Sequence, residues 1–273
     1  IIPSARGNVR SNPREFVLDE VRNIAKEGCR EIVLTGIETA SYGKDFKNGY
    51  GLGDLLAEIN EFEGIDRIRL GSLDPAAVNK DFVDKIKGLS KVMNHFHISM
   101  QSGCTKTLNE MKRKYNIDMA RANLDYLRES IPGVMLSADV ITGFPGEGEA
   151  EFEECYTFLA KIKPSFLHIF PFSERENTPA VNFPDKVSPE VSMARAKRLE
   201  ELSSRCHYDF CKQYLGTTAE VLFESTMRGG MMTGFTSNYL KIKVPYDKRY
   251  INQIVRVRLL SIEPNAEILG EVL

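Results

Sequence analysis

The chain has 273 residues, 42% of them hydrophobic and 27% charged. That is enough to bury a sizeable core, as one barrel-sized domain or as two unequal ones. No apolar run of about 18 residues occurs, and the basic first residues differ from a signal peptide, so we expect a cytoplasmic protein without membrane contact. The net charge of -2 gives no global attraction to polyanions, so nucleic-acid binding would have to come from a local patch.

The five cysteines are an odd number and lie far apart in the sequence. This pattern is typical of reduced thiols rather than of a disulfide framework. Their spacing matches no metal-ligand motif, so we expect no metal site formed by residues of this chain. The five are Cys29, Cys104, Cys155, Cys206 and Cys211.

Between about residues 13 and 171, short apolar runs rich in β-branched residues alternate with amphipathic stretches. This alternation predicts βα units around a parallel sheet or barrel. Five strands are one short of a familiar arrangement, so we expect a first strand upstream of Ile1. The predicted strands are Arg30–Gly36, Arg67–Leu73, His95–Met100, Met135–Thr142 and Leu167–Pro171. The predicted helices are Arg14–Glu27, Leu52–Glu61, Asp81–Leu89, Asp118–Ser130 and Glu149–Ile162.

The period changes in the last third of the chain. A helix predicted from about Glu190 to Tyr214 connects to short strands separated by Gly, Asn and Pro turns, which predict a small five-stranded β-barrel. We therefore divide the chain into residues 1–185, 186–214 and 215–273.

Small and polar residues follow the predicted strands at their carboxyl ends, where ligands gather in α/β folds. After the first run, Gly36 would let the backbone approach a ligand, and Glu38 could hold an ammonium group. Taken alone, a solvated loop glutamate is the commoner explanation. At the end of the third run, Gln101 and Ser102 are better candidates for ligand contact.

Two further strands carry polar residues. His95 and His97 share one strand face with Gln101, and we interpret both histidines as hydrogen-bonded structural residues. Asp139 stands within an apolar run, and a buried unpaired carboxylate is costly. It therefore needs a partner, either a basic side chain of the fold or a polar group of a ligand.

A Gly-Phe-Pro-Gly-Glu turn, Gly143–Glu147, follows Asp139. Pro-Gly is an ordinary turn signal, and Glu147 and Glu149 could simply favour the start of the next helix. Arg113 lies in a basic run that would usually be solvated, but an arginine near a ligand carboxylate can form a bidentate pair.

Two basic segments are candidates for contact with phosphates. Arg6 and Arg10 precede the first acidic residue, although flexible basic loops are common. In the last predicted domain, Lys241 and Lys243 share one strand face, as do Arg256 and Arg258. Tyr239, Tyr246 and Tyr250 are interleaved with these residues. An ordinary solvated face and an RNA-contacting face explain this pattern equally well.

Taken in order, several segments resemble the radical S-adenosylmethionine (SAM) methylthiotransferases over nearly the whole chain. Two of them are most similar to the branch that acts on threonylcarbamoyladenosine next to the tRNA anticodon. The C-terminal segment is similar to the TRAM module, a small β-barrel that holds tRNA. The segments are IIPSARGNVRS, LTGIETASYG, RIRLGSLDP, HFHISMQSGC, MKRKY, ADVITGFPGE, HIFPFSERENTPA and MMTGFTSNYLKIKVP.

The resemblance implies a fold and a set of cofactors. The fold would be a partial (β/α)6 radical SAM barrel that lacks its first strand, followed by a TRAM barrel. The full-length protein would bind SAM and two [4Fe-4S] clusters, whose cysteine ligands would lie upstream of Ile1 and outside this chain. By itself the chain would then hold no cluster and be inactive.

The resemblance also implies the reaction. Cleavage of SAM would yield a 5′-deoxyadenosyl radical, and a methylthio group would be attached to C2 of the modified adenosine. The partners would be tRNA, an electron donor and a sulfur source. An RNA-binding module that roofs the barrel mouth would suit this chemistry, and no side chain would need to act as an acid or base.

The residues named above gain roles from the same resemblance, and all of them would surround SAM. They are Gly36 and Glu38 near its amino group, Ser72, Gln101, Ser102 and Asp139 around its ribose and methionine parts, Arg113 facing its carboxylate, and Gly143 and Phe144 on the adenine side. Within the family, the alternative substrates are isopentenyl-adenosine in tRNA and a ribosomal-protein aspartate. Outside it, the alternative is a non-catalytic RNA-binding relative.

Overall fold

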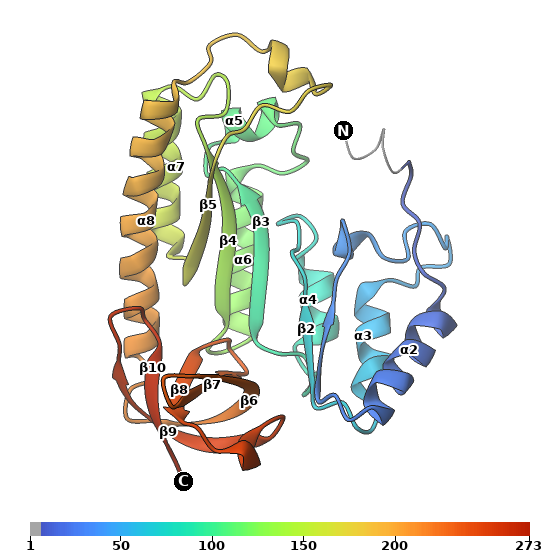
Figure 1. Cartoon of the computed structure of the whole chain (residues 1–273). Coiled ribbons are helices and arrows are strands. Elements are labelled where there is room, and N and C mark those ends of the chain that lie inside the picture. Colours follow the sequence, from blue (N-terminus) through green and yellow to red (C-terminus); the bar gives the residue numbers. More distant parts are fainter. Residues whose placement is uncertain (1–6) are drawn as a thin grey trace.

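The computed structural model describes residues 7–273, and the predicted contact at Arg6 therefore lies outside the described residues. Five parallel strands, in a two-stranded sheet and a three-stranded sheet that lie side by side, form one wall of the molecule (Figure 1). Backbone hydrogen bonds join β2 to β3, because Met93 donates to Ile68 O at 2.9 Å and Ser99 donates to Leu73 O at 2.8 Å. The strands thus follow each other in space as they do in sequence. They are β1 (Glu31–Leu34), β2 (Arg67–Leu70), β3 (His95–Gln101), β4 (Met135–Thr142) and β5 (Phe166–Pro171).

Helices cover the outer face of this wall (Figure 1). Their starts follow from the sequence, since Asn79, Asn116 and Ser188 each accept a hydrogen bond from a backbone N–H in the first turn. No helix within residues 7–273 is long and apolar enough to cross a membrane. The helices are α2 (Arg14–Lys26), α3 (Leu52–Asn60), α4 (Lys80–Ile86), α5 (Thr105–Glu110), α6 (Ile117–Ser130), α7 (Glu149–Ile162) and α8 (Pro189–Lys212).

Strand β3 separates a core face from a polar face. Phe96, Ile98 and Met100 are fully buried in the main hydrophobic core. The alternate residues His97 and Gln101 remain partly exposed on the inner face. This is the two-residue period that the sequence predicts for a strand with one apolar face.

The C-terminal strands close into a barrel, as predicted, with the order β10-β8-β7-β6-β9. Its interior is filled by apolar side chains such as Val221, Ile242 and Val257, all fully buried. Most neighbours are antiparallel, while β8 and β10 are parallel. The strands are β6 (Thr218–Arg228), β7 (Met231–Thr236), β8 (Lys241–Pro245), β9 (Ile254–Ile262) and β10 (Ile268–Val272).

The expectation that this barrel roofs the mouth of the parallel strands is wrong. The barrel packs against the amino-terminal ends of β1, β2 and β3, at the end of the wall opposite the strand-end loops (Figure 1). The reason is charge, because Arg67 and Arg69 at the start of β2 are buried and donate to backbone carbonyls of the barrel. Pattern reading placed these arginines in a strand but did not assign their partners.

Candidate functional site

The carboxyl ends of the parallel strands gather most of the predicted site residues at one end of the molecule. Gly36 and Glu38 follow β1 and are exposed, while Ser72 follows β2 and is partly exposed. Next to Glu38, Thr39 is buried, and its hydroxyl has no hydrogen-bond partner among the described residues. An unpaired buried hydroxyl costs free energy unless a bound molecule or water satisfies it, so this rim has unused hydrogen-bonding capacity.

Gln101 ends β3 in a strained turn. Its φ of 61° lies in the left-handed region, and Ser102 N–H donates to Met100 O at 2.7 Å. The Tyr115 side chain holds this turn in place, since its hydroxyl donates to Met100 O at 2.8 Å. Gln101 therefore stays partly exposed at the rim. Ser102 is fully buried, and its hydroxyl accepts from Cys104 N–H at 3.2 Å, which gives it a structural contact.

Arg113 returns to this rim after α5. Its guanidinium lies 3.8 Å from a carboxylate oxygen of Asp74, which follows β2. About a third of the Arg113 side chain is exposed. Because the ion pair with Asp74 is long and partly exposed, the Arg113 guanidinium retains N–H donors for another carboxylate.

The Gly143–Glu147 turn is held by a buried ion pair that pattern reading missed. The Glu147 side chain is 1% exposed, accepts from Gly143 N–H at 2.6 Å and contacts Arg195 of α8 at 3.1 Å. Burial raises the pKa of the Glu147 carboxyl, against the lowering effect of Gly143 N–H and Arg195. Glu147 thus anchors the turn to α8 rather than simply favouring the start of α7. Phe144 is buried in the same turn.

Asp139 finds its partner within the fold. Its carboxylate lies 2.9 Å from His97 Nε2, and His97 Nδ1 lies 2.9 Å from Ser137 Oγ. His95 Nε2 lies 3.1 Å from the same hydroxyl. Both histidines are hydrogen-bonded within the fold, although His95 Nδ1 is buried without a partner among the described residues, and Asp139 is paired with a side chain of the fold.

His168 joins this inner face and was not predicted. It pairs with Asp139 in the register of β4 and β5, and its ring lies 5.0 Å from that of His97. Desolvation lowers the pKa of His168 below its ordinary value. The sequence feature that could have indicated this role is the position of His168 one residue into an apolar run, on the same strand face as Phe170.

The basic residues of the closed barrel differ in how free they are. Arg256 and Arg258 are both exposed, and the buried Val257 between them confirms that they share one strand face. Lys241 forms an ion pair with Glu267 at 2.7 Å, which neutralises part of its charge. Lys243 is partly exposed two residues further along β8. Arg10, near the start of the described chain, is exposed.

Comparison with known proteins assigns the fold to a family. Residues 1–159 match the Radical SAM superfamily. The chain belongs to this superfamily. Among solved structures, the radical SAM enzyme coproporphyrinogen III oxidase (HemN) from Escherichia coli covers 71% of this chain and 46% of its own, with a TM-score of 0.53 and 16% identity, which shows a shared fold.

The radical SAM chain is also similar to curated tRNA methylthiotransferases. The threonylcarbamoyladenosine tRNA methylthiotransferase MtaB of Bacillus subtilis (strain 168) is 37% identical over 266 residues, 96% of this chain and 59% of the relative. The MtaB of Aquifex aeolicus (strain VF5) is 35% identical over 94% of this chain and 61% of its own length. A tRNA-2-methylthio-N(6)-dimethylallyladenosine synthase of Acetivibrio thermocellus is 33% identical over 96% and 55%. The chain thus spans little more than half the length of these relatives.

The superfamily implies SAM and an iron–sulfur cluster, and the described residues differ in how they fit each. Among the described residues, the rim offers an exposed carboxylate at Glu38, the partly exposed amide of Gln101 and the unsatisfied hydroxyl of Thr39, which suit a polar sulfonium ligand. Within residues 7–273, no group of three or more His, Cys, Asp and Glu side chains could hold a metal. The Cys104 thiol is engaged otherwise, since it donates to Glu154 Oε2 at 3.1 Å. The described residues therefore supply no ligand set for a cluster.

Proposed function

We propose that this chain is the body of a tRNA methylthiotransferase and that its substrate is threonylcarbamoyladenosine beside the anticodon. The observation that carries the proposal is similarity along 96% of the chain, including the closed barrel, to a relative named for that reaction. Bound SAM beside a reduced cluster would supply the radical chemistry and the methyl group. Two [4Fe-4S] clusters, an electron donor and a sulfur source belong to the same proposal.

In this proposal, the rim residues bind and orient SAM. Glu38 would accept from its ammonium group, and Arg113 would donate to its carboxylate. Gly36 and Gly143 would let backbone approach the ligand, while Ser72 and Gln101 would contact its ribose or methionine part. Phe144 shapes the adenine side from within the turn, and Asp139, paired with His97, keeps the inner face polar.

The buried position of Ser102 changes what we propose for it. Its hydroxyl is used by Cys104 N–H, so it would shape the turn that presents Gln101 rather than contact SAM itself. Substituting Gln101 should therefore weaken SAM binding directly, whereas substituting Ser102 should act through the turn.

Methylthiolation of the dimethylallyladenosine (isopentenyl-adenosine) position is the second candidate, because relatives named for that product are 31–35% identical to this chain. The test uses the full-length protein with reconstituted clusters, SAM and a reductant. It is offered tRNA bearing either modified adenosine, and nucleosides are analysed by mass spectrometry. We expect a mass gain of one methylthio group on threonylcarbamoyladenosine only. A gain on the dimethylallyl nucleoside would reassign the substrate, and no gain on either tRNA would reject the proposal in favour of a ribosomal-protein substrate or a non-catalytic RNA-binding role.

A further inference from the structure

The turn between β7 and β8 reaches the starting ends of the parallel strands. Tyr239 lies between two rings, with His95 at 4.4 Å and Phe235 at 4.6 Å between ring centres, and the planes are tilted by only 5° and 15°. The Arg69 guanidinium also lies against this ring, 4.8 Å from its centre. Tyr239 is therefore a stacked bridge between the two parts, although 39% of the residue remains exposed.

Two buried arginines hold the backbone of the same turn. Arg67 donates to Phe235 O at 2.7 Å and to Glu220 O at 3.1 Å. Arg69 donates to Thr236 O at 2.7 Å and to Ser237 O at 3.0 Å, and it also pairs with Glu31 at 2.8 Å. Both arginines are 3% exposed. Without the turn, these guanidinium groups would keep the Glu31 carboxylate and the Glu220 carbonyl but lose three carbonyl acceptors, which is costly for buried charge.

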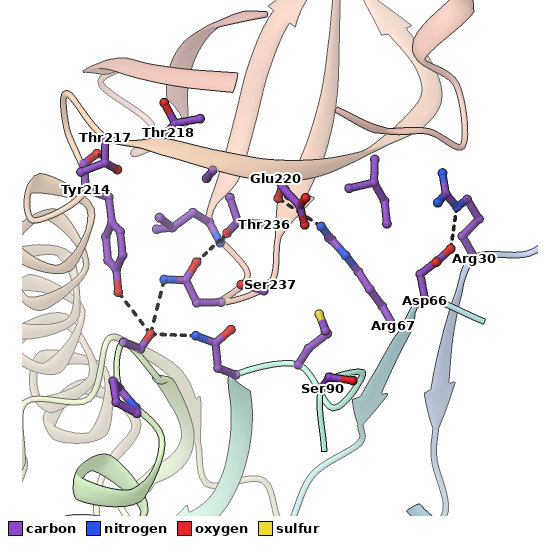
Figure 2. A pocket seen from close by; sticks show the side chains of 18 residues that line it. Arg30, Asp66, Arg67, Ser90, Tyr214, Thr217, Thr218, Glu220, Thr236 and Ser237 are labelled. Atoms are coloured by element: carbon purple, nitrogen blue, oxygen red, sulfur yellow. Dashed lines mark hydrogen bonds and ion pairs between the residues drawn. The ribbon is translucent and has the colours of Figure 1, made fainter. Parts of the chain in front are cut away.

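Away from the turn, few groups join the two parts, among them Asn252, which donates to Gly28 O at 2.8 Å. A cavity of about 720 Å³ separates them and is lined by polar groups that include Arg30, Ser90, Thr217 and Thr218 (Figure 2). At its side, Tyr214 and Asn238 both donate to Gly133 O, at 3.2 and 3.4 Å. The attachment is thus concentrated in a few groups, so a single substitution in the turn is expected to loosen it.

The position of the turn gives it a role in the reaction chamber. His95 lies on the inner face of β3, two residues below His97, so a ring stacked on His95 lies at the base of that face. In closed βα barrels, side chains of the strands themselves fill this end. Here the filling layer comes from another part of the chain.

We propose that the closed barrel has a second function besides RNA contact: the turn Phe235–Tyr239 forms the floor of the radical SAM chamber. SAM cleavage above it then depends on this turn even when no RNA is present. The contacts described above support the existence of the floor. The dependence of SAM cleavage on the floor also rests on the proposed function.

The first experiment tests the floor by hydrogen exchange of the 273-residue chain. Tyr239→Ala should speed amide exchange at residues 66–70 and 94–98 by about tenfold or more, because the lower strand ends lose their cover. Tyr239→Phe, which keeps the ring, should exchange as the parent does. Tyr208→Ala, at an exposed tyrosine on α8, is the matched control. If Tyr239→Ala does not fold, Arg69→Lys takes its place, because it keeps the charge but loses the forked contacts. Equal exchange in the Tyr239 or Arg69 variant and in the Tyr208 control would overturn the floor.

The second experiment measures 5′-deoxyadenosine release by the reconstituted full-length protein without RNA. Tyr239→Ala should lower the rate about tenfold relative to Tyr208→Ala, and Tyr239→Phe should restore it. Unchanged release by Tyr239→Ala would overturn the second function while leaving the proposed reaction intact. If the parent protein releases no 5′-deoxyadenosine, the proposed function fails, and the exchange result still decides whether the floor exists.

Discussion

At the residue scale, buried charge accounts for much of how this site is held. Glu147, Arg195, Arg67 and Arg69 are all nearly inaccessible, and each pairs with groups from a distant part of the chain, while Arg195 Nε has no hydrogen-bond partner among the described residues. Such groups are expensive to strip of one partner. Single substitutions at these positions should therefore lower the stability more than substitutions in exposed ion pairs.

Replacing Glu147 by Gln should destabilise the chain by about 3 kcal/mol, because a buried guanidinium loses its nearest counter-charge. Glu149 contacts the same Arg195 at 3.3 Å but is 70% exposed, so Glu149→Gln should cost less than about 1 kcal/mol. Urea unfolding followed by circular dichroism measures both. Similar losses in the two variants would contradict the assignment of Glu147 as the anchor.

His95 should make the stability depend on pH. Burial, with a smaller contribution from nearby Arg69, lowers the pKa of His95 to about 3, below its ordinary value of 6.5. The unfolded chain then binds a proton that the folded chain does not, so stability falls as the pH drops below about 6.5. Between pH 7 and pH 5, His95→Gln should lose up to about 2 kcal/mol less than the parent. Parallel pH profiles in urea titrations would show that His95 is protonated in the folded state.

At the element scale, the turn after β4 depends on the packing of α8. Gly143 has a φ of 75°, and an added Cβ would lie 2.5 Å from Ser192 Oγ on α8. Gly146 in the same turn has a φ of 85°, but an added Cβ there would meet no atom within 4 Å. Alanine substitutions at the two glycines therefore separate the cost of backbone strain from the cost of a steric clash.

Gly146→Ala should cost about 1 kcal/mol, which is the price of a left-handed backbone. Gly143→Ala should cost about 3 kcal/mol, because the clash adds to that strain. Gly143→Ala should also weaken SAM binding by the full-length protein, measured by equilibrium dialysis. Equal stability of the two variants would show that α8 yields at no cost.

The elements themselves follow from the sequence because their period is local. Predicted and observed bounds of β4 and α7 agree, and β3 differs by one residue. The contacts of Glu147, Tyr239 and Arg69 could not be predicted in this way, because each joins segments that no local period connects. The shared rim of the strand-end loops could be predicted, because it follows from the parallel strands alone. The end at which the closed barrel docks could not, because it depends on contacts between distant segments.

At the scale of the whole molecule, the RNA contacts proposed for the closed barrel and the proposed chemistry lie at opposite ends of the parallel strands. Arg256→Glu should lower tRNA affinity about tenfold and reduce the salt slope of binding by about one to two. Lys241→Glu should have a smaller effect, because Glu267 already neutralises part of the Lys241 charge. Filter binding across salt concentrations measures this, with Lys197→Glu on α8 as the control of equal charge change. Equal affinity of Arg256→Glu and Lys197→Glu would refute contact at this face.

Because the closed barrel docks at the far end, any RNA that contacts both ends must span a fixed distance. Strand β3 has seven residues at about 3.3 Å each, so roughly 20 Å of protein lies between the docking turn and the rim. A target base on a short oligonucleotide could reach the rim but would leave the small barrel idle. Longer stems would engage both ends at once, so recognition would depend on the length and shape of the RNA as well as on the base that is modified.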